Sequence, residues 1–261
     1  MTKLAIMLRV ATAALIGGAL AFSALPASAA GKKEHAPEQD WSFEGPIGHY
    51  DLPSLQRGLQ VYLEVCAGCH SLKYVAYRDL AAIGYGEDEI KAIAARYEVA
   101  DGPDDAGDMF QRPARPSDRF VSPFANEQQA RASNGGALPP DLSLQAKAHL
   151  QGPDYIYALL TGYKEAPADV KMNEGMQYNP YFAGGQIAMP APLSDGSVAY
   201  NDGQPEATVD QMAWDVSNFL MWAAEPKLEM RKRIGWKVVL FVVILAALLY
   251  AAKRKMWADV H

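Results

Sequence analysis

Cysteine is scarce in this 261-residue sequence: only Cys66 and Cys69 occur, and both lie in one short motif. No second cluster of cysteine and histidine accompanies them, so a zinc site with four such ligands is not supported. No βαβ pattern surrounds the pair, which argues against a thioredoxin-like redox site. No internal repeat is visible. The sequence therefore indicates one chemical centre, built around the two cysteines.

That centre is the stretch Cys66-Ala67-Gly68-Cys69-His70, a C-x-x-C-H motif typical of covalent attachment of a c-type haem. Two thiols three positions apart can each form a thioether with one vinyl group of the same porphyrin. The imidazole of His70 then lies under the ring, where it can bind the iron. A structural disulfide, a redox pair or half of a zinc site are the alternatives. The motif predicts one haem c.

Residues 1–30 have the pattern of a secretory signal peptide. Lys3 and Arg9 are basic, an apolar run follows from Val10 to about Leu25, and Ala27-Ser28-Ala29 offers a small-residue cleavage site. An N-terminal membrane anchor is the alternative, because the run is not much shorter than a spanning helix. Export and haem attachment agree, since bacteria attach haem to this motif outside the cytoplasm.

Basic residues are few in the central part of the chain. Residues 31–224 hold 14 Lys and Arg against 27 Asp and Glu, a net charge of −13, whereas residues 225–261 carry 8 basic and 3 acidic residues, a net charge of +5. Nucleic acid is therefore an unsuitable partner for the acidic part. Its acidic side chains are densest between residues 87 and 108. This stretch is either a solvated surface or a docking patch for a basic protein.

Apolar spacing predicts four helices in residues 31–226: one from Ser54, a short one over 88–96, one over 152–161 ended by Gly162, and one over 208–224. Thr208 and Gln211 have the spacing of a capping box. The first and last helices are expected to cross near Gly58. Residues 31–50 are interpreted as an extended arm, and the Pro- and Gly-rich region 111–206 as long loops around a large cofactor.

Residues 234–252 form one long apolar run, and we expect a transmembrane helix there, bounded by Trp236 and Trp257. Arg231-Lys232-Arg233 precede the run and Lys253-Arg254-Lys255 follow it, so the count of basic residues does not decide the orientation. The predicted signal peptide decides the orientation. It places residues 31–226 in the periplasm, 227–252 as a membrane-proximal segment and single-pass anchor in the inner membrane, and 253–261 as a cytoplasmic tail.

An electron carrier needs a second axial iron ligand, and Met189 is the preferred candidate. It lies in an apolar loop bounded by Gly184-Gly185 and Pro190, where small residues allow close approach to a ring. His149 is the next candidate. Met212 fits the packing stripe of the last helix, and three other methionines have polar surroundings: Met109, Met172 and Met176.

Several runs of this sequence resemble the cytochrome c1 family, and the resemblance covers most of the chain after residue 30. The matching runs are Arg57-Gly58-Leu59-Gln60-Val61-Tyr62, CAGCHSLKYVAYRDL at 66–80, Asp101-Gly102-Pro103, Met109-Phe110 with Arg112-Pro113, residues 134–143, Leu160-Thr161-Gly162-Tyr163, Asn179-Pro180-Tyr181-Phe182, Ile187-Ala188-Met189-Pro190 and residues 222–226. Their order, followed by an anchor, makes the resemblance specific.

The resemblance implies a mainly α fold: a class I cytochrome c-like haem domain with long loops, plus one C-terminal transmembrane helix. It implies His70 and Met189 as axial ligands and a haem lined by Asn134, Pro139, Tyr155, Phe182 and Ile187. Many relatives carry arginine near a haem propionate where this chain has His149. The sequence also lacks the cysteines of the extra disulfide found in some bacterial relatives.

The implied function is transfer of one electron from a Rieske iron–sulfur protein to a cytochrome c, within a complex that contains cytochrome b. No residue would act as acid, base or nucleophile. A stand-alone anchored cytochrome that feeds a terminal oxidase or photosynthetic centre is the main alternative. A di-haem peroxidase would need a second C-x-x-C-H motif, and a ligand sensor would need an open sixth position on the iron.

Overall fold

The core of the fold is a crossing of two helices, α2 (Leu52–Glu64) and α7 (Val209–Ala224), in the computed structural model, which describes residues 33–259. A Cβ atom at Gly58 would lie 2.1 Å from the backbone oxygen of Asp215 and 2.7 Å from Cβ of Phe219. The two backbones therefore touch, and only glycine fits at position 58. The predicted crossing near Gly58 is confirmed.

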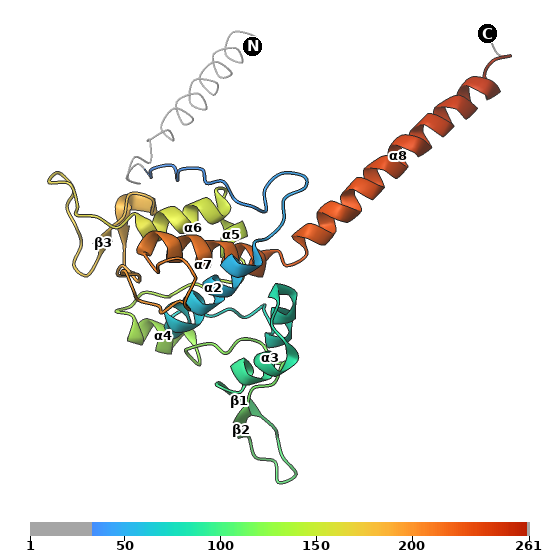
Figure 1. Cartoon of the computed structure of the whole chain (residues 1–261). Coiled ribbons are helices and arrows are strands. Elements are labelled where there is room, and N and C mark those ends of the chain that lie inside the picture. Colours follow the sequence, from blue (N-terminus) through green and yellow to red (C-terminus); the bar gives the residue numbers. More distant parts are fainter. Residues whose placement is uncertain (1–32, 260–261) are drawn as a thin grey trace, which may run out of the picture.

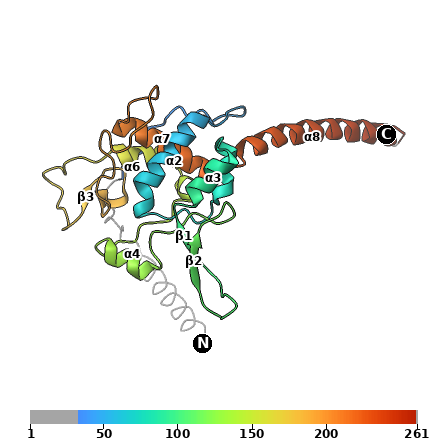
Figure 2. The ribbon, with the colours of Figure 1, turned by 60° about the horizontal axis from the view of Figure 1, so that its bottom comes forward.

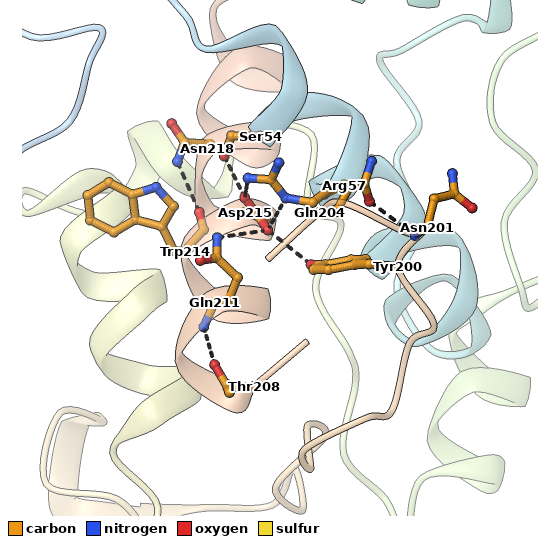
Figure 3. Close-up of polar contacts among 10 residues, drawn as sticks. All are labelled: Ser54, Arg57, Tyr200, Asn201, Gln204, Thr208, Gln211, Trp214, Asp215 and Asn218. Carbon is orange, nitrogen blue, oxygen red and sulfur yellow. Dashed lines mark hydrogen bonds and ion pairs between the residues drawn. The ribbon is translucent and has the colours of Figure 1, made fainter. Parts of the chain in front are cut away.

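A buried ion pair joins the same two helices (Figure 3). The fully buried carboxylate of Asp215 accepts two hydrogen bonds from Arg57, from Nε and Nη2, both at 2.8 Å. It also accepts from Ser54 Oγ at 2.7 Å, Tyr200 OH at 3.0 Å and Gln211 Nε2 at 3.1 Å. A buried charge is tolerated only when it is paired and fully hydrogen-bonded. This network therefore fixes the crossing and ties the loop that contains Tyr200 to it.

Most of the remaining elements pack around this crossing, whereas the C-terminal helix and the first strand pair extend away from it (Figures 1 and 2). The helices are α3 (Glu87–Ala94), α4 (Glu127–Ser133), α5 (Gln145–Ala148), α6 (Gly152–Thr161) and α8 (Leu228–Met256), with 3₁₀ turns η1 (Cys66–Gly68), η2 (Tyr77–Ile83) and η3 (Ala183–Gly185). Two antiparallel strand pairs complete the fold: β1 (Glu98–Asp101) with β2 (Phe110–Pro113), and β3 (Gln177–Tyr178) with β4 (Gln186–Ile187). The predicted mainly α fold is confirmed.

The predicted helices occur close to their expected bounds. Helix α6 ends before Gly162, as expected, and α3 begins one residue earlier than predicted. At the start of α7, Thr208 Oγ1 accepts a hydrogen bond from the backbone N–H of Gln211 at 3.1 Å. The Gln211 side chain binds Asp215 instead of returning to Thr208, so only half of the expected capping box forms.

The segment from residue 33 to 50 has no helix or strand, which agrees with the predicted arm, yet it contributes to the core. The ring of Trp41 stacks on that of Trp214 with centroids 4.2 Å apart, and its Nε1 donates to Asp154 at 2.6 Å. Phe43 is buried beside it. The arm is thus packed against α6 and α7. The predicted signal peptide, residues 1–30, lies outside the described residues.

Helix α8 projects away from the body and is long and apolar enough to cross a membrane, with a mean hydropathy of 2.4 over its most apolar window (Figure 1). It extends beyond the predicted run 234–252 at both ends because the flanking Lys and Arg residues are good helix formers. Glu225 accepts from Lys147 at 2.8 Å and pairs with Arg231, and Tyr50 N–H donates to Glu229 at 2.8 Å. These contacts attach the base of α8 to the body.

The β1–β2 hairpin was not predicted. It carries much of the acidic stretch and extends away from the body (Figures 1 and 2). Arg112 on β2 pairs with Asp101 on β1 and with Asp118, which holds the hairpin together. At its tip, Asp104 Oδ1 accepts from the backbone N–H groups of Ala106 and Asp108, both at 2.9 Å. Several acidic residues of this stretch therefore have structural roles.

Candidate functional site

The Cys66–His70 motif begins where α2 ends. The chain leaves the helix at Val65 and turns through η1, where the N–H groups of Cys69 and His70 both donate to the Cys66 oxygen, at 3.1 and 2.9 Å. This turn leaves Cys66 partly buried and Cys69 exposed. Both cysteines are unpaired, so the disulfide alternative is not realised. Burial, together with the nearby Cys69, raises the pKa of the Cys66 thiol to about 12, which disfavours thiolate redox chemistry at neutral pH.

His70 is held in one tautomer. Its Nδ1 lies 2.8 Å from the carbonyl oxygen of Pro140, and because a carbonyl can only accept, Nδ1 carries the proton. The other ring nitrogen, Nε2, is then the one with a lone pair for a metal. Burial lowers the pKa of His70, which favours the neutral ring that a metal requires. Tyr62 OH donates to the backbone oxygen of His70 at 3.2 Å and fixes the chain beside α2.

The residues after His70 are joined to the segment after Pro140. Asp141 Oδ2 accepts from Ser71 Oγ at 2.7 Å and from the backbone N–H of Lys73 at 2.9 Å. The N–H of Tyr74 donates to Ser143 Oγ at 3.0 Å. Burial alone would raise the pKa of Asp141, but hydrogen bonds from Ser143, Lys73 and Ser71 bring it below its usual value. This pairing keeps the Pro140 carbonyl under the His70 ring.

Two of the predicted lining residues lie before this pairing. Asn134 caps the end of α4, and its Nδ2 donates to the oxygen of Ala130 at 2.7 Å. Pro139 is partly buried and directly precedes Pro140, the acceptor for His70. Both therefore lie on the segment that leads to the His70 contact.

The other three predicted lining residues lie on α6 and around the β3–β4 pair. Tyr155 is buried on α6, Ile187 is buried on β4, and Phe182 is partly buried just before η3. The end of α2, helix α4 and the segment of β3 and η3 lie on the same side of the body in both views (Figures 1 and 2). The elements that carry Asn134, Phe182 and Ile187 thus lie on the side of the body where α2 ends, whereas α6, which carries Tyr155, packs against α7.

Met189 lies two residues after Ile187 and is partly buried. Its carbonyl oxygen accepts a hydrogen bond from Tyr163 OH at 3.1 Å. Of the other methionines considered, Met212 is fully buried in the core between α2 and α7, and Met109 is 65% exposed. Met172 and Met176 are partly buried in the loop before β3.

The ring of His149 packs on that of Tyr155 with centroids 3.9 Å apart, and His149 Nε2 lies 3.0 Å from Gln145 Nε2. Burial, followed by the nearby charge of Lys33, lowers the pKa of His149. His149 therefore lies next to a predicted lining residue and favours its neutral form.

Sequence reasoning missed Pro140 and Asp141 as functional residues. They appear in the sequence only as part of the run 134–143, and nothing local shows that they meet a motif 70 residues earlier. It also missed the Arg57–Asp215 pair. A signal for that pair existed, since Arg57 and Asp215 are charged residues beside the apolar stripes of two helices that were expected to cross.

These features define a protein of the c-type haem class, with two thiols and a histidine on one turn and one helix that is long and apolar enough to cross a membrane. Among residues 33–259 no group of three His, Cys, Asp or Glu side chains is arranged to hold a metal ion directly, which leaves the zinc alternative unsupported. The Cytochrome C1 family model matches residues 41–260, and the chain belongs to that family.

Curated relatives agree with this assignment. The chain is 50% identical over 275 residues to the "Cytochrome b/c1" protein of Bradyrhizobium diazoefficiens, and the match covers 97% of this chain but 40% of that longer protein. It is 50% identical to a mitochondrial cytochrome c1 haem protein of Arabidopsis thaliana, over 92% of this chain and 78% of the relative. It is 52% identical to cytochrome c1 of Rhodospirillum rubrum, over 85% of this chain and 88% of the relative.

Proteins of this family carry one covalently attached c-type haem, and the residues present fit that group. Cys66 and Cys69 supply two unpaired thiols at the required spacing, and His70 supplies Nε2 from a neutral ring whose Nδ1 is already engaged. The family assignment also supports a role in electron transfer within a bc1 complex.

Proposed function

We propose that this chain accepts one electron from a Rieske iron–sulfur protein and passes it to a cytochrome c, as the haem subunit of a quinol–cytochrome c reductase. The proposal is carried by one observation: this member of the family combines the Cys66–His70 attachment turn with a helix that is long and apolar enough to span a membrane. The haem supplies the one-electron redox chemistry when it is bound.

The residues of the chain hold and tune that group. Cys66 and Cys69 would hold the haem through thioethers, and His70 and Met189 would bind its iron. The Pro140 carbonyl, by accepting from Nδ1, keeps the His70 ring oriented and increases the basicity of Nε2. Asn134, Pro139, Tyr155, Phe182 and Ile187 line the group and exclude water. A thioether ligand favours ferrous iron and raises the potential, which suits a carrier late in a chain.

Besides the Rieske protein, three kinds of partner are proposed. Cytochrome b is supported by the Bradyrhizobium relative, whose name joins cytochrome b to c1. Membrane lipid surrounds α8, whose apolar side chains are exposed in this chain. A basic cytochrome c acceptor docks near the β1–β2 hairpin, where Asp105 and Asp108 are exposed and add to the net negative charge of the body.

We place the protein in the cell inner membrane as a single-pass protein. Residues 1–30 are removed as a signal peptide, residues 31–226 form the haem domain in the periplasm, and residues 253–261 remain in the cytoplasm. The length and apolar composition of α8 support a single pass, and the signal-peptide pattern of residues 1–30 is the basis for the orientation.

The test is purification of the full chain from its native membrane in mild detergent. The proposal predicts co-purification with cytochrome b and a Rieske protein, and reduction of the haem by quinol in that preparation. It also predicts oxidation of the haem by added cytochrome c. A chain that purifies without cytochrome b and is reduced only by another donor would instead be the stand-alone anchored cytochrome.

A further inference from the structure

The last turn of α6 and the two residues that follow it make three separate attachments to the segment that ends at Met189. The Asn179 side chain, which is fully buried, donates from Nδ2 to the oxygen of Leu159 at 2.7 Å. A Cβ atom at Gly162 would lie 2.5 Å from the ring of Tyr181, so the ring rests directly on the helix end. The third attachment is the hydrogen bond from Tyr163 to the Met189 carbonyl.

Of these three, only the Tyr163 contact reaches Met189 itself. The first two hold residues 179 and 181, on the other side of η3 and β4. After Met189 the chain runs through Pro190 and Pro192, which have no N–H to donate, before the next buried residue at Leu193. Within residues 33–259, the hydrogen bond from Tyr163 is the long-range hydrogen bond that the Met189 backbone makes, and it spans 26 residues.

Tyr163 is suited to this contact. Its side chain is partly buried, and a tyrosine phenol, with an ordinary pKa of about 10, keeps its proton at neutral pH. The phenol is thus protonated and able to donate over the physiological range. A carbonyl hydrogen bond of this kind restrains the backbone but leaves the thioether of Met189 available for the iron.

We infer that Tyr163 is the positioning residue for Met189: by holding the Met189 carbonyl against the end of α6, it keeps the thioether in place as an iron ligand. This inference rests on the proposed role of Met189. Without the phenol, the Met189 loop opens more readily, and an external ligand competes better for the sixth position on the iron.

The test compares Tyr163→Phe with Tyr157→Phe in the detergent-purified, haem-loaded full chain. Tyr157 is the matched control, because it is a partly buried tyrosine on α6, six residues before Tyr163, and its hydroxyl donates to Asp210 on α7. Imidazole is titrated into the ferric protein and its binding is followed in the visible spectrum. Losing one hydrogen bond should raise the apparent imidazole affinity of Tyr163→Phe about 2- to 10-fold.

Tyr157→Phe should bind imidazole like the parent, even if its melting temperature falls. The inference is overturned if Tyr163→Phe binds imidazole with the affinity of the parent. It is also overturned if Tyr157→Phe gains as much imidazole affinity over the parent as Tyr163→Phe does. Met189→Leu separates this failure from that of the ligand assignment. If Met189→Leu has the parent spectrum, Met189 is not the ligand and both proposals fail. If it loses the methionine–iron band while Tyr163→Phe behaves as the parent does, only the role of Tyr163 fails.

Discussion

The imidazole Nδ1 of His70 donates to the carbonyl of Pro140 across 2.8 Å, although the two residues are 70 positions apart. The carbonyl is placed by its neighbour Asp141, whose carboxylate accepts from Ser71 and from the backbone of Lys73. The orientation of the proposed iron ligand thus depends on a carboxylate that does not touch the histidine ring.

Asp141→Asn should lower the free energy of unfolding at pH 7 by about 1.5–3 kcal/mol, because hydrogen bonds to a charged acceptor are lost. Since the folded pKa of Asp141 lies below its ordinary 3.8, the stabilisation by the charged form is complete above pH 3.8. It is lost as the pH falls from 3.8 through the folded value. The parent should therefore lose stability more steeply than Asp141→Asn in that acid range.

Denaturant unfolding followed by circular dichroism, repeated at several pH values, measures this difference. Asp202→Asn is the control, since Asp202 is an exposed carboxylate in the loop before α7. Parallel curves for the parent and Asp141→Asn below pH 3.8 would show that Asp141 does not hold this pairing.

Gly58→Ala should destabilise the fold by roughly 1–3 kcal/mol, because a new methyl group would overlap the backbone oxygen of Asp215 and push α2 from α7. The buried Arg57–Asp215 pair would be strained by the same movement. Gly235→Ala on α8 is the control, as a Cβ there meets nothing within 4 Å. Thermal melts in detergent compare the two, and an unchanged melting temperature for Gly58→Ala would refute the tight crossing.

Reversing charge at the hairpin tip should slow electron transfer to a basic cytochrome c several-fold at low salt, because electrostatic attraction acts mainly on the association rate. Asp105→Lys with Asp108→Lys is the suitable pair, since the Asp104 side chain holds the turn. Salt screens charges over about 8–10 Å, so the difference should shrink as ionic strength rises.

Stopped-flow oxidation by cytochrome c over a salt series measures this effect. Asp202→Lys with Glu206→Lys supplies the same charge change on another exposed loop. Equal rates for the hairpin variant and the parent at every salt concentration would show that the hairpin is a solvated surface with no role in docking cytochrome c.

Features that depend on neighbouring residues, such as helix bounds and the attachment motif, could be predicted from the sequence. The bounds of α6 and α7 follow from apolar spacing and from Gly162 and Thr208, and the attachment motif is a contiguous pentapeptide. The β1–β2 hairpin was missed because Arg112, pairing with Asp101 and Asp118, holds it rather than any alternation of apolar residues.

Contacts between residues far apart in the chain could not be predicted from the sequence. The acceptor of His70 and the tyrosine that holds Met189 are each determined by how loops pack, over separations of 70 and 26 residues. Trp41 lies in the segment that was interpreted as an extended arm, yet its ring stacks on Trp214 in the core.

The ferric optical spectrum of Met189→Leu, measured beside that of the parent and of Met176→Leu, tests the proposed electron carrier most directly. Met176 is a partly buried methionine in the loop before β3 and controls for loss of any sulfur nearby. We expect the weak charge-transfer band of methionine-ligated iron in the parent and in Met176→Leu, and its loss in Met189→Leu together with a lower reduction potential. A Met189→Leu protein that keeps both the band and the potential of the parent would contradict the assignment.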